Sequence, residues 1–328
     1  MSYPDFLFYE PLPIDPAPLV SLVDQRYLQE TVQAALAADL FSLVKEPVSA
    51  AALAQSAGWD EETTLRLLSV LCHLGCVART ESGYCSTPLA STYLTRDSFF
   101  FYGDKFGDQP ETGSFAHSLL KTLRREDIPP TTHEPVWTPG RLRQMGVHTL
   151  TGYIQNTLSR LDLTGAATLL DLGGGHGFYS VAFAQKYPDL SVTLFDLPAV
   201  MDGARPFISQ TKVGHRIAIR SGNFLHDDIG SGYDAILASN VLHKDKRDLV
   251  LPKIYRALNP GGTFILRCRI ADGPDSLSTA LSKLYWQVWG GRDLYTAAQW
   301  KGFVTPYGFT DFTLYGVDDM FATFTAKK

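Results

Sequence analysis

The sequence has few cysteines and no long apolar run. Its 328 residues include four cysteines, too few for a disulfide framework in a chain of this length. None of their spacings matches the two-plus-two pattern of a structural zinc site. No window approaches the ~18 uninterrupted apolar residues of a membrane span. We therefore expect a cytoplasmic protein with reduced thiols, no metal and no membrane contact.

Positive charge is absent from the beginning of the sequence. The first basic residue is Arg26, and four acidic residues and five prolines precede it. This composition excludes the basic start of a signal peptide. Hydrophobic residues make up 45% of the sequence, which excludes a disordered chain. At roughly 150 residues per domain, the length predicts about two domains.

Charge is unevenly distributed along the sequence. Residues 1–110 hold 6 Lys+Arg and 14 Asp+Glu, whereas residues 165–328 hold 17 and 15. This difference indicates two domains of different character. We place an N-terminal domain at residues 1–95, a connector rich in aromatics and prolines at 96–164, and a second domain at 165–328.

Helical patterns fill the N-terminal domain. A first helix, buried along one side, is predicted from apolar residues at every fourth position: Leu28, Val32, Leu36 and Leu40. Shorter helices follow over residues 49–58 and 60–75, each begun by a capping side chain and ended by a glycine. Residues 76–87 then read as a small hairpin. This order of elements is that of a winged helix.

The charges of the third helix bear on what this domain does. DNA affinity comes largely from Lys and Arg that neutralise phosphates. The helix offers only Arg66 against Asp60, Glu61 and Glu62. We therefore expect a dimerisation module without nucleic-acid partners. A DNA-binding regulator is the competing interpretation, which salt-sensitive binding to duplex DNA would support.

From Ala167 onward, apolar segments of strand length alternate with helices. Such alternation predicts an α/β fold with a parallel, doubly wound sheet. The predicted strands are 168–172, 191–195, 216–220, 235–239, 263–268 and 312–315. Ligands of such sheets bind outside the carboxyl ends of the strands.

A glycine-rich turn follows the first of these strands. The strand carries Asp171 and leads into Gly173, Gly175 and Gly177, which let the backbone turn sharply and approach a ligand. Asp171 either belongs to the ligand site or only orients the loop. Asp196 ends the next strand, 19 residues beyond Gly177, where a carboxylate suits ribose hydroxyls. The spacing of the three glycines differs from the G-x-G-x-x-G of dinucleotide sites.

The motifs occur in the order found in small-molecule O-methyltransferases, and the resemblance covers nearly the whole chain. It rests on the winged helix, the glycine turn, and residues 195–198, 222–224, 240–243, 258–262 and 290–293. The resemblance implies a Rossmann-like doubly wound methyltransferase sheet with an N-terminal, mainly α winged-helix domain. It also implies S-adenosylmethionine (SAM) as methyl donor, S-adenosylhomocysteine (SAH) as product, a homodimer and a place in secondary metabolism.

The resemblance assigns cofactor contacts to the ends of the strands. Gly173, Gly175 and Gly177 would flank the methionine part of SAM, and Asp196 would hold the ribose. The adenine would be framed by three further residues: Leu197, Asn223 and Phe224. Asn223 replaces the usual aspartate, and Ser239 stands where many members have a lysine or arginine.

The resemblance makes His243 the general base that takes a proton from an acceptor hydroxyl. Two glutamates usually orient that histidine; here Cys268 and Asp293 align with them. Only one carboxylate therefore remains. The expected function is O-methylation of a small aromatic or polyketide-like acceptor. Methylation at carbon, nitrogen or sulfur, or a reaction in which SAM is bound without methyl transfer, stays open.

Several residues are candidates for the acceptor pocket. They are Met145, His148, Cys268, Trp286 and Trp289. The resemblance places the helix that holds Trp286 and Trp289 at this pocket, although aromatic stripes are also typical of a core. His148 is equally well explained as a partly buried, hydrogen-bonded residue. Arg267 and Arg269 flank Cys268 and point away from it. The sequence leaves three roles open for these arginines: binding an anionic acceptor, facing solvent, or pairing with carboxylates.

Overall fold

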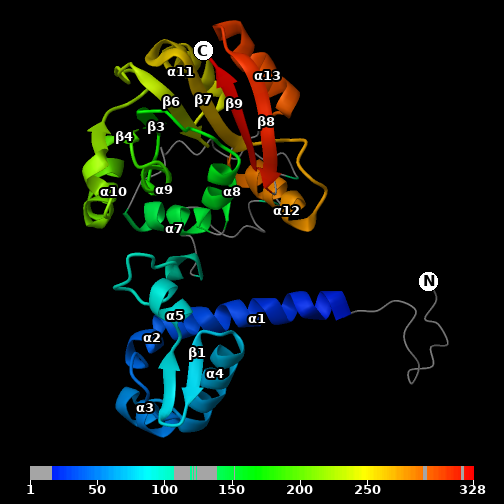
Figure 1. The fold of residues 1–328 in the computed structure, drawn as a ribbon. Helices are drawn as coiled ribbons and strands as arrows, with labels where there is room; N and C mark the ends of the chain where they lie inside the picture. Colours follow the sequence, from blue (N-terminus) through cyan, green and yellow to red (C-terminus); the bar gives the residue numbers. More distant parts are fainter. Residues whose placement is uncertain are drawn as a thin grey trace, which may run out of the picture. The chain divides into compact units, whose positions relative to one another are not determined.

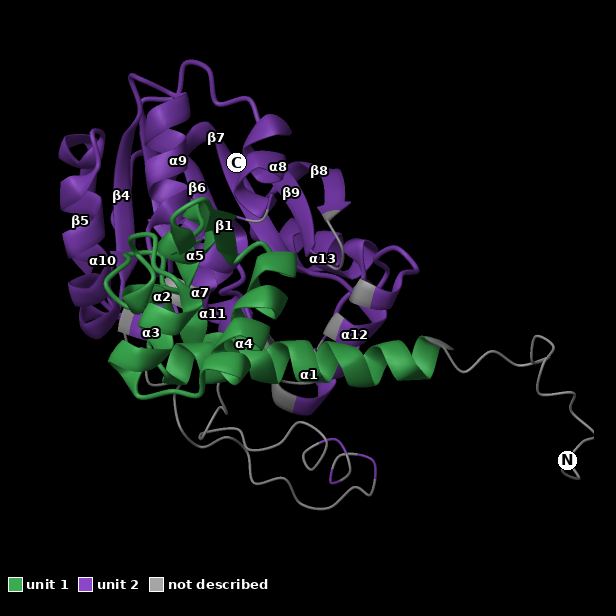
Figure 2. Cartoon of the chain, turned by 90° about the horizontal axis from the view of Figure 1, so that it is seen from below, with its two compact units in different colours: residues 1–108 green, residues 109–328 purple. Residues whose placement is uncertain are grey.

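The structure is a computed structural model of the chain. It describes residues 17–106, 119, 121, 123, 139–150, 152–290, 294–318 and 321–328. The chain divides into two compact units, Met1–Asp108 and Gln109–Lys328 (Figure 2). The division falls inside the predicted connector. Each unit is described by itself below.

Unit 1 consists of helices followed by a two-stranded hairpin (Figure 1). Its elements are α1 (Ala17–Ala37), α2 (Leu40–Leu43), α3 (Ala50–Ala57), α4 (Glu61–His73), β1 (Val77–Thr80), β2 (Gly83–Ser86), α5 (Pro88–Tyr93) and the 3₁₀ turn η1 (Gly103–Phe106). The two predicted caps are confirmed. Ser49 Oγ accepts a hydrogen bond from Ala52 N at 3.1 Å, and Asp60 Oδ1 accepts one from Thr63 N at 2.8 Å.

The first predicted helix is wrong in two respects. The helix ends at Ala37, because Asp39 adopts a left-handed conformation with φ 52°, and Leu40 begins the separate helix α2. Leu28 is 40% exposed, whereas Val32 and Leu36 are buried. The fourfold spacing therefore marks a buried face only in the second half of α1. In its first half the apolar residues remain on the surface.

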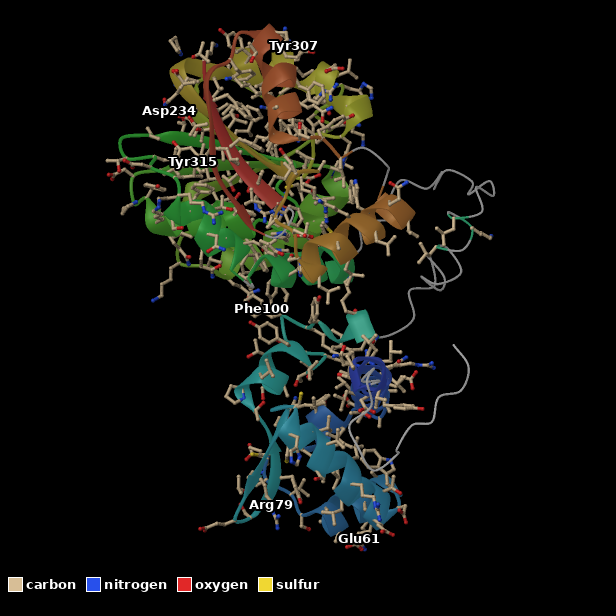
Figure 3. The ribbon with its side chains drawn as sticks, turned by 90° about the vertical axis from the view of Figure 1, so that its right-hand side faces the viewer. Glu61, Arg79, Phe100, Asp234, Tyr307 and Tyr315 are labelled. Carbon is tan, nitrogen blue, oxygen red and sulfur yellow. The ribbon has the colours of Figure 1, made fainter. Side chains whose placement is uncertain are left out.

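The surface of α4 agrees with the expectation from charge. Arg66 pairs with Glu62 of the same helix at 2.5 Å, and both side chains are exposed. Glu61 lies at the start of this helix, and Arg79 lies on β1 (Figure 3). The described part of α4 therefore presents no unbalanced positive charge of the kind that phosphates require.

Unit 2 contains a seven-stranded sheet in the order β5-β4-β3-β6-β7-β9-β8. Its strands are β3 (Thr168–Leu172), β4 (Ser191–Asp196), β5 (Ile217–Ser221), β6 (Tyr233–Ser239), β7 (Leu258–Arg269), β8 (Thr310–Asp318) and β9 (Phe321–Lys327). All six predicted strands are present, within a few residues of their expected bounds. Strands β3 to β7 pair in parallel, which confirms the doubly wound sheet.

The prediction missed the last strand. β9 inserts between β7 and β8 and runs antiparallel to both. Ala322, Phe324 and Ala326 on one face of β9 are buried, and Thr323 and Thr325 on the other face are buried as well. Because both faces are covered and half of the residues are polar, the segment lacks the alternation by which a half-buried strand is identified.

Helices cover both faces of the sheet (Figure 1). α11 (Lys244–Ala257) and α13 (Ala297–Val304) share one core cluster with Leu172, Leu266 and other buried strand residues. α9 (Phe178–Lys186) and α10 (Pro198–Gln210) pack on the opposite side, where Ser180 of α9 reaches Asp171 of β3. The sheet edge that carries the carboxyl ends of β3, β4, β6 and β7 is the place where this fold binds ligands.

The helical segment that holds Met145 and His148 is α7 (Pro139–Thr149), and a second helix, α8 (Tyr153–Ser159), follows it. The two are separated at Gly152, which has φ 108°. α12 (Leu277–Tyr285) continues into a π-helical turn, η3 (Trp286–Gly290); the remaining 3₁₀ turns are η2 (Gly214–Arg216) and η4 (Thr305–Tyr307). None of the described helices combines the length and apolar character that a membrane crossing requires.

Candidate active site

The glycine turn after β3 depends on left-handed backbone. Gly173 has φ 68° and Gly175 has φ 56°. A Cβ atom on Gly173 would lie 2.6 Å from Val241 Cγ1, which leaves no room for any side chain. Gly177, φ 77°, begins α9. The three predicted glycines therefore lie together in one turn at the carboxyl edge of the sheet.

Asp196 ties this turn to the next strand. Its Oδ2 accepts a hydrogen bond from Gly175 N at 2.9 Å, and its Oδ1 accepts one from Leu197 N at 2.7 Å. Burial raises the pKa of the Asp196 carboxyl, and these two backbone bonds oppose that rise. The carboxylate is thus fixed by backbone groups beside the glycine turn.

Asp171 lies beneath the turn and is 1% exposed. Ser180 Oγ donates to its Oδ2 at 2.7 Å, while its Oδ1 has no hydrogen-bond partner within the described residues. Burial raises the pKa of Asp171 to about 7; the Ser180 bond opposes the rise and the charge of Asp196 adds to it. One buried acceptor atom is therefore left without a donor.

The end of β5 lies close to the same turn. Gly222 N donates to Asp196 O at 2.9 Å, and Phe224 Cε1 lies 3.5 Å from where a Cβ of Gly173 would stand. Asn223 Oδ1 accepts a hydrogen bond from Leu225 N at 3.0 Å, so it already stabilises its own loop. Ser239 ends β6, opposite Arg267 of β7.

His243 lies just after β6 at the N-cap position of α11, and its side chain makes no capping hydrogen bond. Its side chain is exposed, and its ring stacks on Trp286 with centroids 5.9 Å apart and planes 27° apart. Trp286 begins the π-helical turn η3; such turns occur often at functional sites. The guanidinium carbon of Arg269 lies 4.4 Å from the centroid of Trp286, and Arg269 Nη1 donates to Asn240 Oδ1 at 2.8 Å.

The two arginines of β7 lie on the face of the sheet opposite Cys268. Cys268 is buried in the cluster beneath α11 and α13, where burial raises the pKa of its thiol well above the usual value. Arg267 is only 3% exposed, with its guanidinium carbon 4.8 Å from the ring centroid of Tyr153 and 4.4 Å from that of Phe321. The expectation of a solvent-facing side chain is therefore wrong for Arg267.

The remaining candidates are less central. Met145 is 40% exposed on α7. His148, also exposed on α7, has its ring centroid 5.3 Å from that of Tyr153. Asp293 and the side chain of Trp289 lie outside the described residues, so the structure does not place the second expected partner of His243.

Sequence reasoning missed Tyr153 and Phe321. Their ring centroids are 5.4 Å apart, and both rings contact the guanidinium group of Arg267. Phe321 begins the strand that the prediction missed, and Tyr153 follows the helix break at Gly152. In the sheet, Phe321 of β9 pairs with Arg269 of β7. Within the described residues, no group of three or more His, Cys, Asp or Glu could hold a metal.

Two family models match the chain. The model of the O-methyltransferase domain matches residues 145–310, and that of the O-methyltransferase dimerisation domain matches residues 20–96. Together they cover most of both compact units.

Curated relatives are similar at modest identity. The chain is 25% identical to 3-hydroxy-5-methyl-1-naphthoate 3-O-methyltransferase of Streptomyces sahachiroi, covering 91% of this chain and 90% of that protein. It is 27% identical to L-tyrosine C(3)-methyltransferase of Streptomyces lavendulae over 50% of this chain and 47% of that protein. For an uncharacterized protein of Methanocaldococcus jannaschii, the match spans 55% of the relative's length.

The fold is similar to that of solved methyltransferase structures. The human N-acetylserotonin methyltransferase in complex with SAM is 22% identical, with a TM-score of 0.72 and coverage of 97% of this chain and 99% of that one. At this identity the likeness establishes the fold. It agrees with the sheet order and the helical layers described above.

Proposed function

Since this chain belongs to the O-methyltransferase family, we propose that it transfers a methyl group from SAM to a hydroxyl of a small aromatic or polyketide-like acceptor. The observation that carries the proposal is the carboxyl edge of the sheet. There Asp196 accepts from the glycine turn, and Gly173 of that turn lies against Val241, two residues before His243. His243 in turn stacks on Trp286, which also contacts the guanidinium group of Arg269. The naphthoate methyltransferase of Streptomyces sahachiroi supports an aromatic acceptor.

The residues at the glycine turn fit SAM. The left-handed Gly173 and Gly175 keep side chains out of the turn. Among the described residues the buried Asp171 Oδ1 has no donor, and a cationic amino group would supply one. Asp196 faces the ribose, while Leu197, Asn223 and Phe224 frame the adenine. Ser239 lies beside them without the cation that many family members have. When bound, SAM supplies a methyl group activated on a sulfonium.

The protein then has to orient the acceptor and remove its proton. A neutral histidine suits a hydroxyl proton near neutral pH. His243 is exposed at the carboxyl edge, and the stacked Trp286 holds its ring plane. Asp293 is assigned to orient the imidazole. Cys268 lies in the core cluster in place of the other usual glutamate, so the base has fewer charged orienters than in the family pattern.

Incubation of the purified protein with SAM and a panel of hydroxyarenes tests the activity. Mass spectrometry should detect acceptors that gain one methyl group, with equal formation of SAH. Fragmentation or NMR of the product should place the methyl on oxygen. A methyl on carbon, nitrogen or sulfur would replace O-methylation by the alternative chemistry, which the C-methylating relative from Streptomyces lavendulae supports.

The proposal includes a homodimer formed through unit 1. The dimerisation model covers residues 20–96, and the first half of α1 exposes apolar side chains such as Leu19, 69% exposed, and Leu22, 61% exposed. A face of this kind is costly to leave in water. Sedimentation analysis should give a dimer for the intact chain, and Leu19→Lys with Leu22→Lys should shift it toward monomer. A wild-type monomer would contradict this part of the proposal.

A further inference from the structure

Among the residues that the structure describes, the buried cation Arg267 has no anionic partner. Within the same residues its Nε and Nη2 atoms have no hydrogen-bond partner, and no carboxylate forms an ion pair with it. Its surroundings are the rings of Tyr153 and Phe321, at 4.8 and 4.4 Å from the guanidinium carbon. Of the three alternatives that the sequence left open, exposure to solvent and pairing with a described carboxylate therefore both fail.

Aromatic rings alone do not satisfy this group. A ring face attracts a cation, but the N–H groups of a guanidinium lie in its plane and need acceptor oxygens. A buried charge without such acceptors destabilises the fold. Arg267 is therefore better explained as one half of an interaction that a bound ligand completes.

The position of Arg267 is at the carboxyl edge of the sheet. It pairs in register with Ser239, the last residue of β6, and its carbonyl accepts a hydrogen bond from Asn240 N at 2.7 Å. Strand alternation puts Arg267 on the face of α8 and α9, away from the cluster that holds Cys268. This is the face on which Asp171 and the glycine turn lie.

Ring contacts connect Arg267 to the candidate base. Arg267 and Arg269 both lie against Phe321, at 4.4 and 4.5 Å from its centroid. Arg269 also contacts Trp286, and Trp286 stacks on His243. Two like charges on one ring repel each other, so an anion beside them is favoured. A flat acceptor that extends from His243 along Trp286 approaches this cationic pair.

We propose that Arg267, with Arg269 beside it, binds a carboxylate of the methyl acceptor. The substrate class is then a hydroxyarene carboxylate and not a neutral phenol. A guanidinium binds a carboxylate through two parallel hydrogen bonds, which would use the N–H groups that are now unpartnered. This inference rests on the proposed function. SAM carries a carboxylate too, so the experiment has to separate the two sources.

The test is calorimetric binding to the SAH-loaded, full-length protein. The probes are hydroxyarene acids and their decarboxylated counterparts, such as salicylate with phenol and 3-hydroxy-1-naphthoate with 2-naphthol. The wild type should bind at least one acid about tenfold or more tightly than its counterpart. In Arg267→Met this preference should fall below about threefold, and in Arg267→Lys, which keeps the charge without the fork, it should be intermediate.

Three controls make the result specific. Arg256→Met removes the same charge from an exposed position on α11 and should keep the full preference for the acid. The affinity for SAH, measured first, should change less than about twofold in every variant, because the proposed ligand is the acceptor. Thermal unfolding should show that Arg267→Met is as stable as the wild type or more so, since an unpaired buried charge is removed.

The contrary outcomes are distinct. If no acid binds more tightly than its counterpart, or if Arg267→Met keeps the preference, the proposal is wrong. If Arg267→Met weakens SAH instead, the carboxylate is that of the methyl donor and the acceptor assignment is overturned. If the wild type does not bind SAH at all, it is the proposed function that fails.

Discussion

At the glycine turn the site is made of backbone, whereas at the end of β7 it is made of long side chains. Asp196 uses both carboxylate oxygens on the N–H groups of Gly175 and Leu197, and among the described residues of this turn only Asp171 Oδ1 lacks a partner. Around β7, by contrast, Arg267 Nε, Arg267 Nη2 and Trp286 Nε1 are all buried without partners among the described residues. The polar atoms at the end that we propose for the methyl donor are therefore largely satisfied. At the end that we propose for the acceptor, several are not.

This difference fits the proposed division of the site between a donor end and an acceptor end. A site fixed by backbone changes little when side chains are substituted, which suits a common methyl donor. A site formed by side chains changes with each substitution, which suits a particular acceptor. The comparison predicts that substitutions at the glycine turn weaken SAH binding, whereas substitutions at the acceptor end lower turnover and leave SAH binding unchanged.

The largest expected effect is on turnover, at the acceptor end. His243→Ala should lower the methylation rate of a hydroxyl acceptor by roughly 10²–10⁴-fold, because the proton acceptor is lost. Its affinity for SAH should stay within about twofold of the wild type. His215→Ala, at an exposed histidine of η2, is the matched control and should leave the rate unchanged. Near-wild-type turnover of His243→Ala would rule out the base-dependent mechanism.

The next effect is on donor binding. Asp196→Asn puts an amide N–H against a backbone N–H of Gly175 or Leu197, so SAH should bind about 100-fold more weakly by calorimetry. Asp234→Asn is a suitable control, because Asp234 also accepts backbone bonds, from Ala167 and Thr168, but at the opposite end of the strands (Figure 3). It should leave SAH binding unchanged. Equal losses in both variants would mean that general stability, not the site, is responsible.

The stability of the folded protein should depend on pH through Asp171. Its pKa in the folded protein is about 7, against an ordinary value of 3.8, because burial penalises the charged form. The folded state therefore holds the proton more tightly, and stability is lost as the pH rises from about 4 through about 7. The melting temperature of the wild type, measured relative to that of Asp171→Asn, should fall between pH 5 and pH 8. A pH-independent difference would contradict the protonated carboxyl.

The same measurement with saturating SAH decides what Asp171 does. If Asp171 faces the cationic amino group of the ligand, the bound ligand favours the ionised carboxylate and the difference between the two proteins should shrink. If Asp171 only orients the turn, the difference should persist.

The smallest expected effect is at Asn223. We propose that residue 223 accepts from the adenine amino group, and Asn223→Asp would make this acceptor charged. The variant should then bind SAH about fivefold more tightly, the difference between a neutral and a charge-assisted hydrogen bond. Calorimetry at moderate ionic strength measures it. Weaker binding instead would indicate that repulsion from Asp227, which accepts the Asn223 backbone N–H, dominates.

Much of the donor end could be predicted from the sequence. The spacing of Gly173, Gly175 and Gly177 and the position of Asp196 after the next strand are local patterns, and parallel strands bring their carboxyl ends to one edge. The structure accordingly joins Asp196 directly to the turn. The caps at Ser49 and Asp60 were predictable for the same reason, because each acts within three residues of itself.

The acceptor end could be predicted only in part. The alternation around Cys268 put both arginines on one face, but their partners come from segments far apart in the sequence. Tyr153 follows a helix break, and Phe321 begins a strand whose two faces are both buried. Neither local spacing nor composition carries that information. The exposed first half of α1 was missed similarly, because periodicity does not reveal what covers a helix face.

The most direct test of the account is calorimetric titration of SAH into the wild type, Asp196→Asn and His243→Ala under one set of conditions. The account predicts micromolar binding to the wild type, about −8 kcal/mol, the same affinity for His243→Ala, and about 100-fold weaker binding to Asp196→Asn. Absence of binding to the wild type, or equal weakening in both variants, would contradict a preformed donor site that is separate from the acceptor end.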